Sequence, residues 1–286
     1  MIRLSIIMAT RNSARYLSEA LASIGPSCGA NIETEVLLAD GGSSDETLTI
    51  AASYPGLRII SREDSGIYCG MNRALAAARG DYAIILNSDD LLLPSAIADA
   101  LDVIEQAPDC SFVSGQALFG RDASNATVRS HAGALSLEGA MFGIPAINAR
   151  IFRVDALREL GPIRTDLGLA ADREWMARWV RNGRRGCALF APLYLYRIHV
   201  GSHTISGDQT GKLRVYRAEL ELAEALIGRE PTETNLRKLA HANRAFALLR
   251  LQWKDASAAR FSDISLLDLS RGLMLAYRWR GKLSGF

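Results

Sequence analysis

Residues 66–90 read GIYCGMNRALAAARGDYAIILNSDD, and the order of signals in this stretch decides the fold. The first part, residues 66–78, predicts a helix that a glycine stops, and residues 82–87 predict a short apolar strand. Two adjacent acids, Asp89 and Asp90, follow almost at once. Adjacent carboxylates repel one another, so the pair marks a solvated turn, a cap for the next helix, or oxygen ligands for a cation or a substrate hydroxyl.

The residues before this stretch show the same alternation of strand and helix. The complete order is βαβαβαβ, which predicts a parallel sheet with right-handed crossovers and helices on both faces. In such a sheet the ligand crevice lies beyond the carboxyl ends of the strands, where Asp40 and the Asp89–Asp90 pair both fall. The earlier strands and helices are expected at residues 4–10, 12–24, 35–40, 43–54 and 57–61.

Beyond the acid pair the pattern is less regular. A loop-rich stretch is expected up to residue 142, and residues 211–286 are predicted to be helical with apolar stripes. We find no internal repeat and no low-complexity linker. The remaining expected elements are helices at residues 95–106, 154–161 and 172–183 and a strand at 110–118.

The composition is that of a globular protein with a core, since 49% of the 286 residues are hydrophobic and 22% are charged. The net charge of +2 gives no indication of nucleic-acid binding. Residues 211–286 contain 14 Lys and Arg against 8 Asp and Glu, whereas residues 1–210 contain 19 against 23. No apolar run reaches the roughly 20 residues that a bilayer span needs, and the first one is too short for a signal peptide. We therefore expect a cytoplasmic protein, or one attached to the inner face of the cytoplasmic membrane.

The four cysteines, Cys28, Cys69, Cys110 and Cys187, lie far apart in the sequence and show no metal-ligand or redox spacing. Four free thiols in a reducing compartment are therefore expected. The pattern does not favour a catalytic cysteine.

Two polar clusters lie beyond the second and third predicted strands. In LADGGSSDET, Asp45 fits a helix cap, and Asp40 is left as an acceptor for a polar group such as the imide N–H of a uracil. The alternative for this cluster is a tight turn with no ligand. In SREDSGIYCGMNRAL, Asp64 and Asn72 lie on either side of a Ser-Gly turn, and the alternative is an exposed charged loop.

Two clusters in the second half of the chain contain further candidates. AADREWMARW begins a helix with Asp172 and Glu174, although acids in a first helical turn also suit the helix dipole without any catalytic role. In YRIHVGSHT, His199 and His203 have the spacing of a helical metal pair, but Gly201 between them disfavours a helix. We expect only one of the two histidines to bind a metal.

Taken in order, SIIMATRN, LLADGGSSDET, EDSGIYCGMNRALAAARGDYAIILNSDD and LAADREWMARW resemble the inverting family-2 glycosyltransferases with the GT-A fold. The stretch GIY…MNRAL…G…LNSDD is especially similar to enzymes that build bacterial exopolysaccharide and other surface glycans on lipid-linked intermediates. The resemblance covers about residues 3–205. It implies an α/β fold with a mostly parallel central sheet and helices on both faces.

The resemblance also implies a division of the chain. A single GT-A domain occupies residues 1–210, with a nucleotide-binding half at 1–90 and an acceptor half at 91–210. Residues 211–286 form a C-terminal helical extension that the resemblance does not cover.

Donor-binding residues follow from the same resemblance. Asp40 corresponds to the acid that reads the nucleotide base, with Thr10 and Arg11 near the same pocket. Asp64 and Asn72 are assigned to the nucleotide-sugar site as well.

The resemblance further implies a metal site and a base. Asp89 and Asp90 match the end of the family's DxD element, one for the ribose and one for the Mn²⁺ or Mg²⁺ that bridges the diphosphate. His199 falls where a late histidine completes the metal shell. Asp172 matches the acid of the family's "ED" element, the general base. Two departures stand out: the first DxD acid is Asn87, and the residue before Asp172 is Ala171, which leaves Glu174 as a rival base.

The implied activity is metal-dependent, inverting transfer of a sugar from a nucleotide sugar, UDP-sugar in preference to GDP-sugar, to a hydroxyl of a glycan or lipid-linked acceptor. A sugar-phosphate nucleotidyltransferase would need a glycine-rich loop after the first strand, where this chain has MATRNSARY. The alternative from another class is a catalytically inactive nucleotide-binding scaffold subunit of a glycan-assembly complex, which the two departures keep open. A homo-oligomer is a further candidate assembly.

The C-terminal segment LLDLSRGLMLAYRWRGKL is expected to form an amphipathic helix. Its predicted apolar stripe is flanked by basic and aromatic residues, which suits a helix lying on an anionic membrane surface. The alternative is packing on protein, which Gly272 and Leu275 favour because both weaken the amphipathic pattern. The predicted stripe consists of Leu266, Leu269, Leu273, Ala276 and Tyr277.

Overall fold

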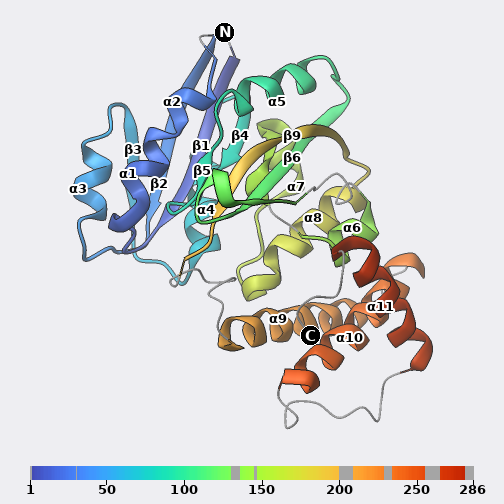
Figure 1. Ribbon diagram of the computed structural model, residues 1–286. Helices are drawn as coiled ribbons and strands as arrows, with labels where there is room; N and C mark the ends of the chain where they lie inside the picture. The colour runs from blue at the N-terminus through green and yellow to red at the C-terminus, as the bar shows by residue number, and fades with distance from the viewer. Residues whose placement is uncertain are drawn as a thin grey trace. The chain divides into compact units, whose positions relative to one another are not determined.

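The computed structural model describes residues 2–29, 31–129, 136–144, 147–199, 209–228, 234–254 and 265–280 (Figure 1). The chain forms two compact units. The first contains Met1–Ala132, Ala146–Thr165 and Asn182–Arg197, and the second contains Gly133–Pro145, Asp166–Arg181 and Ile198–Phe286. A domain boundary after residue 210 stays a prediction, since these units also place two earlier segments with the C-terminal helices.

The first unit begins with the expected parallel strands. Their order is β3-β2-β1-β4, and all three pairings are parallel. The register places Thr10 beside Asp40 and Asp40 beside Ser61, so these strands end at one edge. The strands are β1 (Ile2–Thr10), β2 (Ile32–Asp40), β3 (Leu57–Ser61) and β4 (Tyr82–Ile85).

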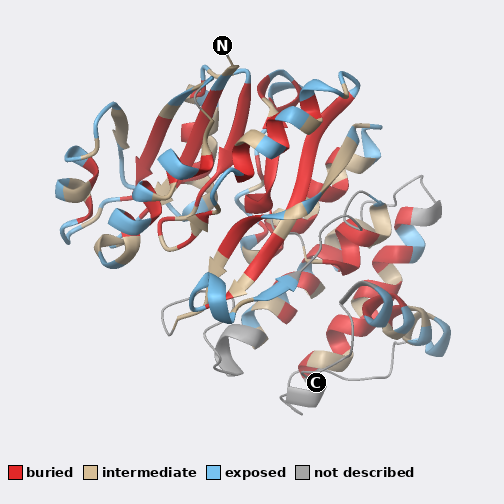
Figure 2. Cartoon of the chain, turned by 45° about the horizontal axis from the view of Figure 1, so that its top comes forward, coloured by how far each residue is buried: buried red, intermediate tan, exposed pale blue. Residues whose placement is uncertain are grey.

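Helices cover both faces of this sheet, because alternate residues of each strand point to opposite sides. On one face Leu4, Ile6 and Met8 share a buried cluster with residues of α1 (Ala14–Ala22) and α5 (Ala96–Glu105). On the other face α4 (Ile67–Ala77) approaches so closely that a Cβ on Gly70 would lie 3.1 Å from that of Ala9. Figure 2 shows the resulting burial of the strands. The shorter helices of the unit are α2 (Ile24–Ser27), α3 (Thr47–Ala52) and α7 (Val154–Leu160).

The rest of the sheet is mixed. Strand β8 (Arg150–Arg153) is antiparallel to both β4 and β6 (Cys110–Gly120), whereas β6 is parallel to β9 (Arg185–Arg197). Two short strands pair antiparallel, β5 (Leu91–Leu92) with β9 and β7 (Thr127–Arg129) with β6. The described part of the sheet therefore has nine strands.

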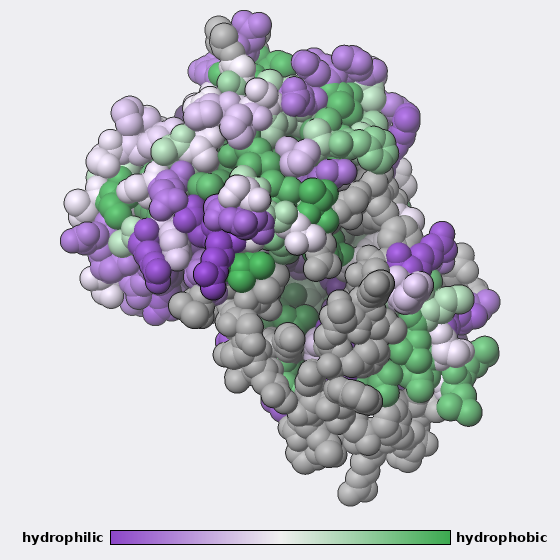
Figure 3. Space-filling view, viewed as in Figure 1, coloured by the Kyte–Doolittle hydropathy of each residue, from purple (hydrophilic) through white to green (hydrophobic). Residues whose placement is uncertain are grey.

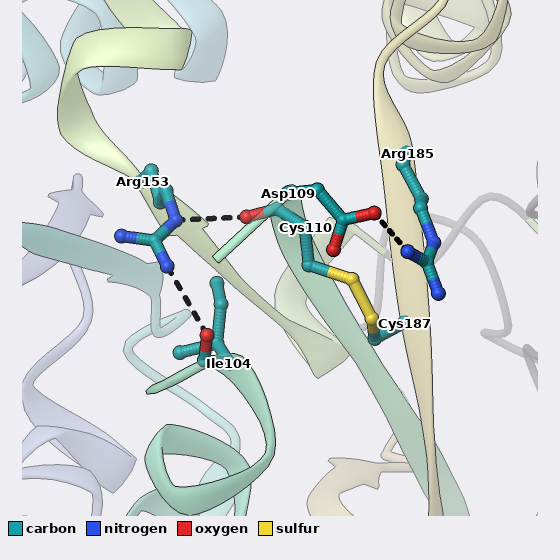
Figure 4. The surroundings of a disulfide bond; sticks show 6 residues. All are labelled: Ile104, Asp109, Cys110, Arg153, Arg185 and Cys187. Atoms are coloured by element: carbon teal, nitrogen blue, oxygen red, sulfur yellow. Dashed lines mark hydrogen bonds and ion pairs between the residues drawn. A yellow bond between two sulfur atoms is a disulfide. The ribbon is translucent and has the colours of Figure 1, made fainter. Parts of the chain in front are cut away.

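The expectation of four free thiols is wrong for two of the cysteines. Cys110 and Cys187 form a disulfide, and only Cys28 and Cys69 are free (Figure 4). Residues 77 apart in sequence meet because β6 and β9 are neighbouring parallel strands, which brings the two Cα atoms to 6.0 Å. Arg153 donates to the Cys110 carbonyl at 2.8 Å and thereby links β8 to β6 beside the disulfide.

The second unit is helical, as expected for the C-terminal third. Helices α9 (Gln209–Gly228) and α10 (Thr234–Lys254) bury Tyr216, Leu222 and Phe246, among others. Two helices from earlier in the chain, α6 (Leu137–Phe142) and α8 (Ala171–Arg181), also belong to this unit. None of the helices that the structure describes is long and apolar enough to cross a bilayer.

The last helix, α11 (Leu266–Arg280), buries only Ala276 of the stripe that its sequence predicts, leaving Leu269 and Leu273 half-buried. Gly272, Leu275 and Ala276 are buried, whereas Leu266 and Tyr277 are 83% and 62% exposed. Gly272 explains which side of α11 is buried, because it lets the helix approach the carbonyl of Ala242 on α10. A Cβ at position 272 would lie only 2.5 Å from that carbonyl oxygen. The side chains of Trp279 and Arg280 and all of Lys282, like His203, lie outside the part that the structure describes.

Candidate active site

Asp40 ends β2 and organises the turn that follows it. Its Oδ2 accepts bonds from the backbone N–H groups of Gly42 and Ser43, both at 2.9 Å. Its Oδ1 accepts from the Ser43 hydroxyl at 2.5 Å and from the Thr10 hydroxyl at 3.3 Å. Asp40 has no exposed surface, and its carboxylate holds together the turn that follows β2.

The loop after β1 is joined to that turn. Asn12 has a positive φ of 51°, and its side-chain carbonyl accepts from the Ser44 N–H at 2.9 Å. Its own N–H donates to the Ser43 hydroxyl at 2.9 Å. Arg11, next to it, is exposed, and Thr10 is buried. The predicted residues Thr10, Arg11 and Asp40 therefore come together at the carboxyl edge of the sheet.

Asp64 faces the same turn. Its Oδ2 accepts from the Arg73 guanidinium at 2.8 Å, and Arg73 also donates to the Asp40 carbonyl at 3.4 Å. A Cβ on Gly41 would lie 2.9 Å from Asp64 Oδ1, so only glycine permits this approach. The Asp64–Arg73 ion pair thus lies at the end of β2, and our site prediction included only its acid.

The side chain of Asn72 makes two hydrogen bonds to the backbone of Ile163. Its amide N–H donates to the Ile163 carbonyl at 2.7 Å, and its carbonyl accepts from the Ile163 N–H at 2.9 Å. These two bonds fix the segment after α7 to α4. The assignment of Asn72 to the donor site stays a prediction, but its side chain is occupied by the backbone here.

The two adjacent acids after β4 have different surroundings. Asp90 is 1% exposed, and its Oδ2 accepts from the Tyr194 hydroxyl at 2.7 Å and from the Asn87 amide at 3.0 Å. Its Oδ1 accepts from the Arg197 N–H at 2.8 Å. Asp89 is only partly buried. The turn therefore buries one carboxylate and leaves the other at its surface.

Burial raises the pKa of Asp90 to about 7, and repulsion from Asp89 adds to the rise. The hydrogen bonds from Arg197, Tyr194 and Asn87 lower this pKa again, but only in part. The pKa of Tyr194 is raised well above its usual value, also mainly by burial. The hydroxyl of Tyr194 further accepts from the Asn87 N–H at 3.1 Å and from the Asn148 amide at 3.3 Å. Tyr194 is thus the centre of the network that holds the turn.

The oxygens of this turn fit a hard divalent cation. Asn87 Oδ1 is buried and accepts no hydrogen bond from any residue that the structure describes. Together with the Asp89 carboxylate it supplies the neutral and anionic oxygen ligands that Mg²⁺ and Mn²⁺ accept. No group of three or more His, Cys, Asp or Glu able to hold a metal occurs among the described residues. His199 belongs to the second unit and is half-buried.

The candidate base lies at the start of α8 in the second unit. Asp172 and Glu174 both stand in its first turn, where the helix dipole favours a negative charge. Glu174 accepts from two nitrogens of Arg178, at 3.2 and 2.9 Å. A proton taken up by Glu174 would weaken this pair, and the choice between Asp172 and Glu174 as the base stays a prediction.

Between these acids, Arg173 fixes the helix. It is 4% exposed and donates to the carbonyls of Ala140, Met141 and Gly143 and to Glu219 at 3.0 Å. Arg250 donates to the other oxygen of Glu219 at 2.8 Å. The sequence motif points to the acids on either side, and no local signal marks Arg173 as buried.

Comparison with known proteins identifies the family and the fold. The model of the family described as "Glycosyl transferase family 2" matches residues 5–161. A segment of 94 residues is 42% identical to a "PGL/p-HBAD biosynthesis glycosyltransferase" of Mycobacterium bovis, and this match covers 31% of our chain and 36% of that protein. The match thus spans only about a third of the length of that curated relative.

Two solved structures share the fold. That of residues 1–349 of Staphylococcus aureus TarS, in complex with UDP-GlcNAc, has a TM-score of 0.64 at 17% identity and covers 97% of our chain and 80% of its own. That of the mannosyltransferase PcManGT from Pyrobaculum calidifontis, in complex with GDP-Man and Mn²⁺, has a TM-score of 0.64 at 19% identity, with 98% and 82% covered. Both likenesses show the GT-A fold. Because the family model matches more than half of the sequence, the chain belongs to glycosyl transferase family 2.

Proposed function

We propose that the protein transfers a sugar from a nucleotide-sugar donor to a hydroxyl of a glycan or lipid-linked glycan, in bacterial polysaccharide biosynthesis. The observation that carries this proposal is the turn after β4, where Asp89 and the unsatisfied Asn87 Oδ1 stand at the carboxyl edge of the sheet. Membership of family 2 and the glycosyltransferase names of the relatives support it.

A UDP-sugar is the proposed donor. The likeness to TarS in complex with UDP-GlcNAc supports this choice, whereas the likeness to PcManGT in complex with GDP-Man keeps a GDP-sugar as the second candidate. In the first unit, Asp40 and Thr10 hold the loop against which a base would lie, and the Asp64–Arg73 ion pair is nearby.

We further propose that Asp89 and Asn87 hold Mn²⁺ or Mg²⁺, with His199 as a candidate third ligand. A divalent cation, when bound, neutralises the charge that develops on the diphosphate leaving group. Asp90 then keeps the turn in shape, since its own oxygens are occupied by Tyr194, Asn87 and Arg197.

The proposed chemistry is a single displacement with inversion. Asp172 accepts the proton of the acceptor hydroxyl, and the oxygen attacks the anomeric carbon from the face opposite the diphosphate. The bond from the anomeric carbon to the diphosphate oxygen breaks, and the nucleoside diphosphate leaves with the electron pair. No covalent enzyme intermediate forms.

The place of action is proposed to be the cytoplasm, with peripheral attachment to the inner face of the cytoplasmic membrane. The basic excess of residues 211–286 supports attachment, and a lipid-linked acceptor would make it useful.

The test is a thermal-shift and turnover experiment on the full chain. UDP-GlcNAc with Mn²⁺ should raise the melting temperature, and the purified protein should release UDP slowly by hydrolysis. Asp172→Asn should retain donor binding and lose turnover by orders of magnitude. Tight donor binding with no turnover on any acceptor or on water would instead support the inactive scaffold subunit. No binding of any nucleotide sugar would contradict both.

A further inference from the structure

A groove crosses the surface of the second unit between α6, α10 and α11. Its volume is about 640 Å³. Leu239 of α10 and Leu275 of α11 are buried and form its apolar floor. Nothing in the proposed reaction uses this groove.

Three cations surround the groove. Arg271 and Arg278 lie two helical turns apart on α11, and Lys238 faces them from α10. The single acid in the lining is Glu138, which pairs with Arg278 at 3.4 Å. That pair is exposed, with 67% of the arginine and 41% of the glutamate side chain accessible, so an anion can replace it at little cost.

The exposed side of α11 adjoins the groove and is mostly apolar, with Ser270 as the polar residue among its large hydrophobic side chains. Four of the seven large hydrophobic side chains that are exposed in the described part of the chain lie on this helix: Leu266, Leu267, Met274 and Tyr277. At about 100° per residue they fall within about 100° of arc around the helix axis, and Met274 also lines the groove. Figure 3 shows hydrophobic residues gathered over α11, with hydrophilic residues beside them.

We propose that this groove binds the phosphate headgroup of an anionic bilayer lipid, while the exposed side of α11 lies among the lipids. Basic residues around a groove beside an apolar helix face are what an anionic membrane interface requires. A second copy of the chain fits less well, because a symmetric contact would bring the same cations together. This inference rests on the proposed membrane attachment and assigns it to named residues.

The first experiment measures co-sedimentation of the full chain with vesicles. Vesicles of phosphatidylcholine with phosphatidylglycerol should bind the protein in a salt-sensitive manner, and vesicles of phosphatidylcholine alone should not. The variant Lys238→Ala/Arg271→Ala/Arg278→Ala should bind about a hundredfold more weakly, since each basic residue contributes about fivefold.

A matched control removes three exposed arginines of the first unit, as Arg79→Ala/Arg121→Ala/Arg185→Ala. It has the same net charge as the groove variant and should bind vesicles like the wild type. An equal loss of vesicle binding in both variants would show that total charge alone matters. It would contradict the groove as the lipid-binding site. Glycerol phosphate added in solution distinguishes the source of the phosphate: displacement of the protein at low concentration would show a site for free phosphates and contradict a lipid site.

The second experiment tests the apolar side. Leu267→Ser/Met274→Ser/Tyr277→Ser should weaken vesicle binding, whereas Val128→Ser/Phe190→Ser, at exposed positions of the first unit, should not. A dimer of the wild type by light scattering that the α11 variant abolishes, with unchanged vesicle binding, would overturn the proposal in favour of a protein contact. Donor binding in the presence of Mn²⁺ should be unchanged in all of these variants. If the wild type binds vesicles through the groove but binds no nucleotide sugar, the proposed transferase activity fails and this inference stands.

Discussion

At the scale of the residue, the turn after β4 separates two neighbouring carboxylates by their surroundings. Asp89 keeps access to solvent, whereas Asp90 accepts three hydrogen bonds in the interior. We therefore expect Asp89→Asn to abolish Mn²⁺-dependent binding of UDP-GlcNAc without lowering the melting temperature. Asp90→Asn should lower the melting temperature instead, because an amide cannot accept from Tyr194 and Asn87 as a carboxylate does. Calorimetric titration and thermal unfolding measure the two effects. Loss of Mn²⁺-dependent binding in Asp90→Asn instead of Asp89→Asn would make Asp90 the metal ligand.

Tyr194 gives a second prediction at this scale. Its hydroxyl satisfies Asp90, the Asn87 N–H and the Asn148 amide, and all of these groups are buried or half-buried. Tyr194→Phe should reduce the free energy of unfolding by about 1–3 kcal/mol, since buried polar groups lose their partner. Urea unfolding measures the change, with the exposed Tyr277→Phe as the control that should change nothing. Equal stability of Tyr194→Phe and wild type would contradict the network.

The sequence identifies the acids of the site but not their surroundings. Asp40, Asp89 and Asp90 could be located because each follows a predicted strand whose end faces the crevice. Tyr194 could not, since it lies 104 residues from Asp90 and comes into reach only through the pairing of β9 with β5 and β6. Asn72 shows the same limit, because its partner Ile163 is 91 residues away.

At the scale of the element, α8 is held by a buried guanidinium. Arg173→Met would remove one of the two arginines that donate to Glu219 and would take the guanidinium donor from three backbone carbonyls. We expect a loss of about 3 kcal/mol in the free energy of unfolding. Arg178→Met on the same helix breaks the partly exposed pair with Glu174 and should cost less than Arg173→Met. Urea unfolding of both variants tests this. Similar losses of unfolding free energy would contradict the role of Arg173 in holding α8.

The disulfide between β6 and β9 gives the second prediction at this scale. It closes a loop of 77 residues in the unfolded chain, and the chain-entropy model gives about 4 kcal/mol of stabilisation for a loop of this length. Dithiothreitol should therefore lower the melting temperature of the wild type and leave Cys110→Ser/Cys187→Ser unchanged. In a reducing cytoplasm the wild type would show the lower value. Alkylation of all four cysteines in unfolded, unreduced protein would contradict the bond.

Elements differ in how much of them local sequence predicts. The alternation up to residue 90 predicts β1 to β4 and their parallel orientation, because each strand is apolar and each helix begins and ends with clear signals. Strand β8 has only four residues and β5 only two, and both are defined by pairing with distant strands. In α11 the apolar pattern points to one side, and the close approach at Gly272 selects another.

At the scale of the whole molecule, metal removal is the simplest test of the proposed chemistry. Chelation with EDTA should abolish both turnover and the thermal shift that UDP-GlcNAc produces. Mn²⁺ should restore both, because oxygen ligands such as Asp89 and Asn87 Oδ1 exchange such a cation readily. The melting temperature without donor should change little. Full turnover in EDTA would contradict a metal-dependent mechanism.

The Cys110–Cys187 bond also has a topological consequence. All peptide bonds between these two cysteines belong to a covalent ring, and the ring includes α6, β8, α7 and the whole of α8 with Asp172. A protease that cuts once within the ring would open it without releasing a fragment. The nicked protein would migrate as one species on a non-reducing gel and as two after reduction, and the candidate base would remain tethered to the candidate donor site.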